Sequence, residues 1–180
     1  MQSINQKIEL PFLSNCTIYI KREDLIHPIV SGNKFRKLKY NIVQAKVENK
    51  TQLLTFGGAY SNHIAAVAYA AKENGFRSIG IIRGDELKSR ISDNPTLRFA
   101  QKCGMEFDFV SREVYRLKEE RTFVENLKQK FGDFYLIPEG GTNELAIKGC
   151  EEILAQGDEI FNYICCSVGT GGTISGLINS

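Results

Sequence analysis

A lysine stands at the start of a predicted helix, directly after a tight turn. Residues 31–34 read Ser-Gly-Asn-Lys, and apolar residues then recur at helical spacing from Phe35 to Ala45. A lysine on a helix is commonly a solvated side chain, but an amine whose direction is fixed can hold a carbonyl compound as a Schiff base. Lys34 is therefore the first candidate for chemistry. Lys37 and Lys39 lie ~300° and ~500° further round the helix at ~100° per residue, and we expect neither to replace it.

Two distant loops have the composition of anion-binding turns between a strand and a helix. In the first, Gly57–His63, the residues Ser61, Asn62 and His63 lead into an alanine-rich helix. Backbone N–H groups at a helix start attract carboxylate or phosphate, and glycine lets the backbone approach an anion closely. A plainer interpretation makes Ser61 or Asn62 a helix cap and His63 a packed histidine. The second loop follows an apolar run and consists of Gly169, Thr170, Gly171, Gly172 and Thr173.

Taken together with Lys34, the two loops indicate a particular cofactor. An amine beside one site for a carboxylate and another for a phosphate suggests pyridoxal 5'-phosphate bound as a Schiff base. The loop at 169–173 lacks the Gly-Lys-Ser/Thr ending of a P-loop and is not a clean GxGxxG, which disfavours a nucleotide. A nucleotide-binding Rossmann-like domain stays open as an alternative. A third glycine turn, Pro138–Asn143, is either a plain loop with a helix cap or a hinge that lines the cleft.

The composition is that of a compact globular protein. The 180 residues are 42% hydrophobic and carry a formal net charge of +2, which advertises neither nucleic acid nor an anionic membrane as a partner. The five cysteines show no paired metal-ligand spacing, and scattered thiols fit a reducing compartment. No apolar run approaches the ~20 residues of a membrane span, and no signal-peptide pattern is visible. We expect a cytoplasmic protein without a metal site.

Strands and helices alternate along most of the chain. After an irregular lead-in over residues 1–16, the β-branched and apolar runs predict strands at 17–20, 52–56, 78–82, 105–110, 134–137 and 163–168. Besides the lysine helix, we expect helices at 61–74, 94–102, 111–130 and 144–155. This alternation predicts right-handed βαβ units, and therefore an α/β fold of parallel twisted sheets with helices on both faces.

The first and last of these strands lie outside the regular block. The four strands between residues 37 and 140 can form one parallel sheet, whereas 17–20 and 163–168 must pair with each other or with something missing. A two-stranded piece is marginal alone. We therefore interpret the chain as the N-terminal portion of a longer polypeptide. The alternative is a naturally short chain with that pair docked on the main sheet.

The motifs together resemble the fold-type II pyridoxal-phosphate enzymes, specifically the branch of 1-aminocyclopropane-1-carboxylate deaminase and D-cysteine desulfhydrase. The matching pieces occur in family order along nearly the whole chain, at 21–24, 31–38, 57–58 with 61–62, 138–141 and 169–173. The Pro-Glu-Gly-Gly turn at 138–141 is more similar to the desulfhydrase. The resemblance implies a tryptophan synthase β-like, two-domain fold, in which 1–36 begins a large domain, 37–143 is a small domain with the four-stranded sheet, and 144–180 resumes the large domain, incomplete at the C-terminus.

The resemblance also implies roles for the candidate residues. Lys34 would hold the cofactor as a Schiff base and later move the substrate proton, and Asn62 would bond the cofactor phenolate. Ser61, with the N–H groups around Asn62 and His63, would hold the substrate carboxylate. Residues 169–173 would hold the cofactor phosphate. The family's group facing the pyridine nitrogen and its active-site tyrosines cannot be located in this chain.

The implied activity is β-elimination and deamination of a small amino acid. A D-cysteine desulfhydrase-like reaction would give pyruvate, ammonia and sulfide, and we expect a homodimer when the protein is complete. One alternative within the family is 1-aminocyclopropane-1-carboxylate deamination, with Ser61 helping to open the ring. Another is a truncated or non-catalytic protein that keeps the pyridoxal-phosphate pocket.

Overall fold

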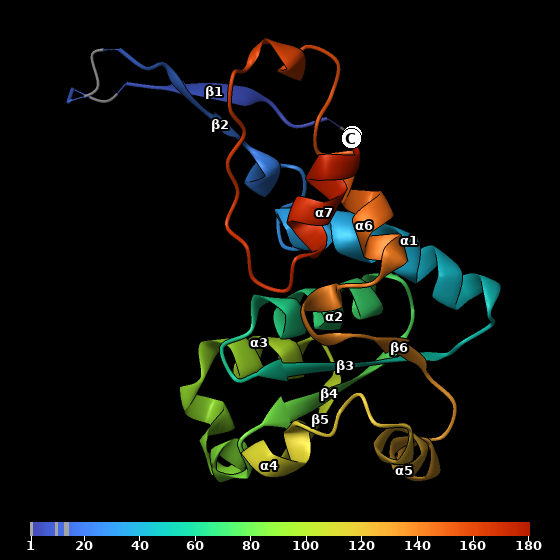
Figure 1. Cartoon of the computed structure of the whole chain (residues 1–180). Helices are drawn as coiled ribbons and strands as arrows, with labels where there is room; N and C mark the ends of the chain where they lie inside the picture. The colour runs from blue at the N-terminus through green and yellow to red at the C-terminus, as the bar shows by residue number, and fades with distance from the viewer. Residues whose placement is uncertain (1, 10, 13–14) are drawn as a thin grey trace.

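The computed structural model describes residues 2–9, 11–12 and 15–180 (Figure 1). Its central element is a sheet made of β3 (Gln52–Gly58), β4 (Arg77–Arg83), β5 (Met105–Val110) and β6 (Tyr135–Ile137). The strand order is β5-β4-β3-β6, and all three pairings are parallel. The expected four-stranded parallel sheet and the α/β fold class are therefore confirmed.

Helices cover both faces of this sheet because its strands are apolar on both sides. In β3, Leu53 and Leu54 are both fully buried, and successive side chains of a strand point to opposite faces. Leu53 lies in the core with α2 (Asn62–Glu73) and α3 (Pro95–Lys102). Leu54 lies in a second core with residues of α4 (Arg112–Tyr115) and α5 (Arg121–Phe131). Figure 1 shows these helix pairs on opposite sides of the strands.

A separate helical layer carries the lysine. It consists of α1 (Asn33–Val47), α6 (Glu144–Cys150) and α7 (Gly172–Asn179), which pack side by side in Figure 1. Glycines allow the close approach: a Cβ on Gly149 would lie 2.0 Å from the Arg36 carbonyl oxygen, and one on Gly176 would lie 2.3 Å from the Cys150 Cβ. Leu38, Ile42 and Ala45 of α1 share a hydrophobic core with residues of α2, which keeps this layer beside α2.

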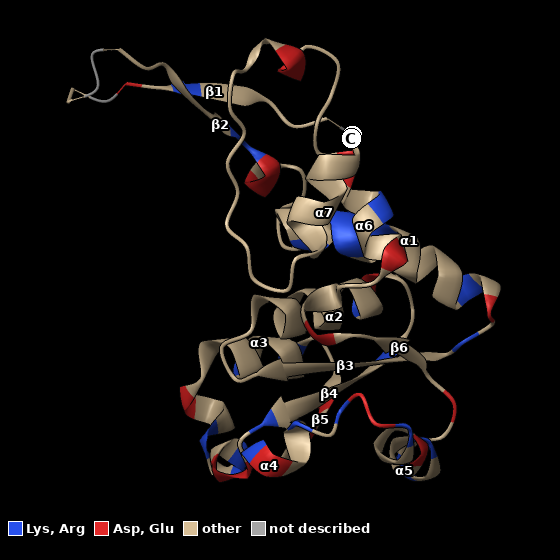
Figure 2. Ribbon diagram, in the orientation of Figure 1, with Lys and Arg blue, Asp and Glu red and all other residues tan. Residues whose placement is uncertain are grey.

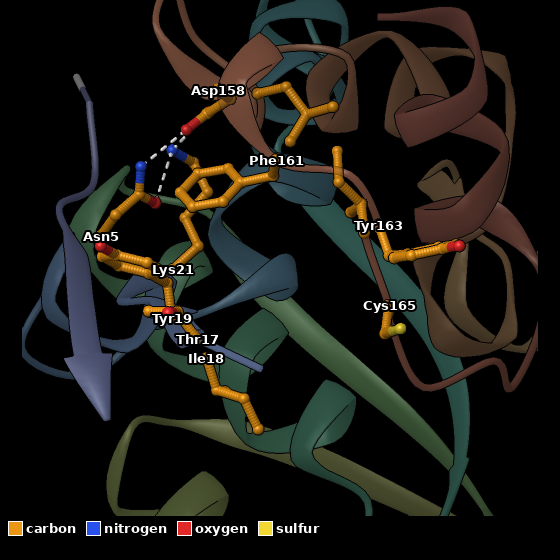
Figure 3. A pocket seen from close by; sticks show the side chains of 11 residues that line it. Asn5, Thr17, Ile18, Tyr19, Lys21, Asp158, Phe161, Tyr163 and Cys165 are labelled. Carbon is orange, nitrogen blue, oxygen red and sulfur yellow. Dashed lines mark hydrogen bonds and ion pairs between the residues drawn. The ribbon is translucent and has the colours of Figure 1, made fainter. Parts of the chain in front are cut away.

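The N-terminal strands form a hairpin of their own. β1 (Asn5–Ile8) pairs antiparallel with β2 (Ile18–Lys21), away from the main sheet. The Lys21 amine lies 2.7 Å from the Asp158 carboxylate, which also accepts a 2.7 Å hydrogen bond from Asn5 (Figure 3). These polar contacts lie beside an otherwise apolar hollow of about 430 Å³ whose walls include the rings of Tyr19 and Phe161.

One expected strand is absent, and the strand expected at 17–20 is present but has a different partner from those expected. Residues 163–168 form no strand; they run as exposed chain, because no neighbouring strand in the described part of the protein offers them a hydrogen-bonding ladder. Strand 17–20 pairs instead with β1, inside the lead-in that we expected to be irregular. The alternative in which both outer strands dock on the main sheet is contradicted too. Lead-in residues 1, 10, 13 and 14 lie outside the described residues.

Two expected helices are also shorter than the sequence pattern indicates. The helix expected at 111–130 is divided into α4 and α5, because Tyr115 is buried against the sheet while the residues after it turn back. The helix expected at 144–155 ends at Cys150, and the backbone N–H of Ala155 bonds to the Asp158 carboxylate at 2.8 Å instead of to a helical carbonyl. Short 3-10 turns occur at Glu23–Leu25, Asp85–Asp93, Glu139–Gly141 and Asp158–Ile160.

The surface properties agree with the composition. Figure 2 shows Lys and Arg interspersed with Asp and Glu around α4 and α5. Among the described residues, no helix combines the length and apolar character needed to cross a membrane, and no group of His, Cys, Asp and Glu is arranged to hold a metal ion. The division into domains at residues 36/37 and 143/144 stays a prediction.

Candidate active site

The Lys34 amine lies between the two predicted loops. Gly32, with φ +62°, turns the chain into α1, and Lys34 is the second residue of that helix. Its Nζ donates to the Gly140 carbonyl at 3.2 Å. Lys34 lines one cavity of about 190 Å³ with residues of the 169–173 loop and another of about 410 Å³ with Asn62. Lys34 therefore lies near residues of the 169–173 loop and near Asn62 of the 57–63 loop.

Lys37 is a functional candidate that our sequence reasoning missed. Its Nζ donates to the same Gly140 carbonyl at 3.3 Å and to the hydroxyls of Thr142 and Thr170 at 3.0 and 3.4 Å. The signal was present in the spacing, because residues three apart on a helix lie on the same face. A rotation of ~300° is also ~60° in the other direction. The amine of Lys37 thus reaches the site from one turn further along α1.

The loop at 169–173 forms the start of α7 beside these amines. Gly171, with φ +85°, caps the helix, and Gly172 is buried at its first position. A Cβ on Gly172 would lie 2.9 Å from Thr142 Cγ2 and 3.1 Å from the Lys37 Nζ, so a larger residue there would make these side chains shift. Thr173 accepts a 2.8 Å hydrogen bond from the Asn33 side chain. Cationic amines, hydroxyls and the N–H groups of a helix start all face the 190 Å³ cavity, which is the chemistry that a phosphate requires.

The 57–63 loop leads into α2 as expected. Ser61 is the N-cap, and its hydroxyl accepts from the Ile64 N–H at 3.4 Å. Asn62 is the first helical residue and shares the 410 Å³ cavity with Lys34. Gly57 packs closely under the turn, since a Cβ there would lie 2.5 Å from Ile64 Cγ1. Asn62 and the lysine thus line the same cavity. The structure shows Ser61 as a helix cap, and its catalytic role stays a prediction.

The imidazole of His63 faces the protein interior. It is 2% exposed, and its Nε2 lies 2.8 Å from the Thr55 hydroxyl, which itself donates to the Ile137 carbonyl at 2.8 Å. Burial, aided by the positive charges of Lys34 and Lys37, lowers the pKa of His63 to about 3. The ring is therefore neutral at ordinary pH and braces β3 against β6. Of the roles implied for His63, the described geometry suits only its backbone N–H.

The two lysines are easier to deprotonate than ordinary lysines. Burial, followed by repulsion from Lys37, lowers the pKa of Lys34 to about 8. Burial also lowers the pKa of Lys37, partly offset by the nearby Cys150 thiol. A lysine with a pKa near 8 has an appreciable unprotonated fraction at neutral pH, and that form is the nucleophile and the base.

The arrangement of these groups fits pyridoxal phosphate. A partly buried amine of lowered pKa lines one cavity with the Asn62 side chain and another with the glycine- and threonine-rich loop at 169–173. In keeping with this, residues 4–180 match the family described as "Pyridoxal-phosphate dependent enzyme". The chain belongs to this family of fold-type II pyridoxal-phosphate enzymes.

Within the family, the chain is similar to the deaminase and desulfhydrase branch. It is 37% identical over 167 residues to a putative 1-aminocyclopropane-1-carboxylate deaminase of Thermotoga maritima, covering 89% of this chain and 52% of the relative. It is 31% identical to a bifunctional D-cysteine desulfhydrase/1-aminocyclopropane-1-carboxylate deaminase of Arabidopsis thaliana, covering 93% of this chain and 46% of the relative. Both likenesses bear out the resemblance seen in the sequence.

A solved structure gives the same result. The crystal structure of an ACC deaminase homologue matches with a TM-score of 0.79 and 30% identity, over 98% of this chain and 55% of that chain. The chain thus spans about half the length of the curated relatives and of the structure that it matches.

Proposed function

We propose that this chain carries the cofactor-binding half of a pyridoxal-phosphate enzyme that eliminates and deaminates a small amino acid. The observation that carries the proposal is the convergence of Lys34, Lys37 and the 169–173 loop on one cavity. Lys34 also lines the cavity that contains Asn62. An amine with a phosphate-binding loop on one side and an asparagine amide on the other provides the functional groups that this cofactor needs. The family match supports the same cofactor.

Each residue then has a defined task. Lys34 would hold the cofactor, and its amine would move the proton at the substrate Cα. Lys37 and residues 169–173 bind the phosphate, and the Asn62 amide donates to the cofactor's ring oxygen. Ser61 and the free N–H groups at the start of α2 orient the substrate carboxylate. When bound, pyridoxal phosphate supplies an electron sink for the bond broken at Cα.

We propose D-cysteine as the substrate class, with release of sulfide, ammonia and pyruvate. The Pro-Glu-Gly-Gly turn at 138–141 supports this choice, and D-cysteine desulfhydrase of Yersinia pestis is 31% identical over 174 residues. The second candidate is 1-aminocyclopropane-1-carboxylate, which the names of several relatives favour. A cytoplasmic homodimer is part of the same proposal.

The cofactor assignment is tested by trapping. The chain is incubated with pyridoxal phosphate, reduced with borohydride and digested, and the modified lysine is identified by mass spectrometry. We expect the adduct on Lys34, and its loss in Lys34→Ala but not in Lys39→Ala, since Lys39 pairs with Glu152 on the far side. An adduct on a different lysine of the wild-type chain would overturn the assignment.

The substrate assignment needs a separate assay. Chain loaded with pyridoxal phosphate but not reduced with borohydride is offered D-cysteine, L-cysteine and 1-aminocyclopropane-1-carboxylate, and sulfide and 2-oxo acids are measured. Sulfide with pyruvate from D-cysteine supports the desulfhydrase reaction, whereas a four-carbon 2-oxo acid from the cyclopropane substrate supports the deaminase. Cofactor binding without either product supports the non-catalytic alternative.

A further inference from the structure

The turn that follows β6 is held from behind by a buried tyrosine. The Tyr115 hydroxyl donates to the Glu139 carboxylate at 2.9 Å, and Tyr115 is only 3% exposed. Its ring packs edge-on against Phe56, with centroids 6.2 Å apart, and the Arg83 guanidinium carbon lies 5.6 Å from the centroid of the Tyr115 ring. The position of the hydroxyl is therefore fixed by the core beneath the sheet.

The hydroxyl stays a donor throughout the ordinary pH range. Burial, together with the Glu139 carboxylate, raises the pKa of Tyr115 far above its usual value. Lys118 also pairs with Glu139, but at 3.4 Å and at a partly exposed position. At 3.4 Å this ion pair is longer than the 2.9 Å hydrogen bond from the buried Tyr115 hydroxyl, and a hydrogen bond to a charged group contributes more than a partly exposed ion pair. Tyr115 is thus the main anchor of Glu139.

The residue after Glu139 touches the lysines. Gly140 has φ +68°, and its carbonyl accepts from Lys34 at 3.2 Å and from Lys37 at 3.3 Å. The turn also packs closely against the 169–173 loop, because a Cβ on Gly140 would lie 2.9 Å from Thr170 Cγ2 and 3.0 Å from the Thr170 hydroxyl. The turn is therefore wedged between Tyr115 and the lysine site, so a shift of Glu139 moves the carbonyl that both amines contact.

We propose that Tyr115 and Glu139 are positioning residues whose hydrogen bond fixes the Gly140 carbonyl over the Lys34 amine and keeps that amine out of water. The proposal rests on the proposed function, in which Lys34 carries the cofactor. Neither residue touches the cavities that Lys34 lines. The pair instead acts through the backbone of the turn, and it links the core under the sheet to the reacting amine.

The test measures the ionisation of Lys34 without any cofactor. The 180-residue chain is trace-labelled with acetic anhydride from about pH 6 to 11, and the modification of Lys34 is followed by mass spectrometry. Burial is the main reason why Lys34 has a lowered pKa. Tyr115→Phe and Glu139→Ala should therefore each move the labelling midpoint up by about half a unit or more, which is about a threefold fall in the unprotonated fraction at neutral pH.

Three further variants make the result specific to the hydrogen bond. Glu139→Gln keeps an acceptor oxygen and should resemble the wild type. The double variant Tyr115→Phe/Glu139→Ala should shift the midpoint no further than Glu139→Ala alone. Tyr40→Phe is the matched control, because it also removes a tyrosine hydroxyl that bonds to a glutamate, Glu152, but lies away from the turn. It should leave the midpoint unchanged.

The proposal is overturned if Tyr115→Phe folds and leaves the midpoint unchanged or lowered, or if Glu139→Gln shifts it as much as Glu139→Ala. If Tyr115→Phe does not fold, Glu139→Ala decides by the same measurement, since its side chain is partly exposed. The labelling needs no pyridoxal phosphate. A shifted midpoint together with a borohydride adduct on another lysine would therefore refute the proposed function while supporting the positioning of the amine.

Discussion

The Asn33 side chain donates a 2.8 Å hydrogen bond to the Thr173 hydroxyl, across 140 positions of sequence. Asn33 is the first residue of α1 and the neighbour of Lys34, whereas Thr173 lies in the first turn of α7. This bond joins the start of the lysine helix to the start of the helix that follows the glycine loop. The amine and the phosphate cradle are thereby held in one arrangement.

Asn33→Ala should weaken cofactor binding more than it weakens the fold. Loss of one hydrogen bond of this kind costs about 0.5–1.5 kcal/mol, so we expect a several-fold rise in the Kd for pyridoxal phosphate, measured by absorbance titration. Asn179→Ala is the control, since it removes an exposed 3.3 Å hydrogen bond at the other end of α7. Equal Kd values for the two variants would contradict this role of Asn33.

Lys37→Gln should have two separable effects. It removes a cation from the phosphate cavity, where charged hydrogen bonds contribute about 1.5–3 kcal/mol, so the affinity for pyridoxal phosphate should fall about tenfold or more. It also removes the positive charge that helps to lower the pKa of Lys34, so the pH midpoint of adduct formation should rise above about 8. Lys39→Gln, which loses a pair with Glu152 and a contact with the Tyr40 ring, should change neither quantity.

Ser61→Ala should cost little stability and leave cofactor absorbance intact. Replacing an N-cap serine costs about 0.5–2 kcal/mol, and the long 3.4 Å bond from the Ile64 N–H places this cap at the low end. Asn94→Ala, which removes the buried 2.9 Å cap of α3, should lower the Tm more. If Ser61→Ala abolished cofactor binding while substrate turnover per bound cofactor stayed normal, the carboxylate role of Ser61 would be wrong.

His63 should make the protein labile to acid. Its folded pKa of about 3 lies below the ordinary 6.5, so between these values the unfolded chain binds a proton that the folded chain does not. The free energy of unfolding should therefore decrease as the pH is lowered from about 6.5 to about 3, by up to about 1.4 kcal/mol per pH unit. Urea titrations should show a shallower pH dependence for His63→Gln. His27→Gln, at the other histidine, serves as the control.

The C-terminal part of the chain should bind hydrophobic dye. Four large apolar side chains here are between 65% and 89% exposed: Ile160, Tyr163, Val168 and Ile178. Residues 163–168 also pair with no strand among the described residues. Exposed apolar surface of this kind promotes association. We expect dye fluorescence and concentration-dependent oligomers, both reduced in Tyr163→Lys/Val168→Lys. A monomer that unfolds sharply and binds no dye would contradict this prediction.

The sequence by itself determined the features that depend on local pattern. Apolar runs such as 52–56 predicted strands, and their alternation with helices predicted the parallel sheet that β3, β4, β5 and β6 form. The Ser-Gly-Asn turn predicted the start of α1 and singled out Lys34. The family resemblance rested on the same short motifs. These features follow from backbone propensity and hydrophobic periodicity, and both depend only on residues that are close together in the sequence.

Tertiary structure decided what depends on residues far apart in sequence. It brought the amine of Lys37 onto the Gly140 carbonyl beside Lys34, and it turned the ring of His63 into the core against Thr55. It divided the helix expected at 111–130 into α4 and α5, with Tyr115 at the end of α4 buried in the core and bonded to Glu139, 24 positions further along the chain. Residues 163–168 show the converse, because their sequence favours a strand but they form none. A strand requires backbone hydrogen bonds to a neighbouring strand, and propensity alone does not supply them.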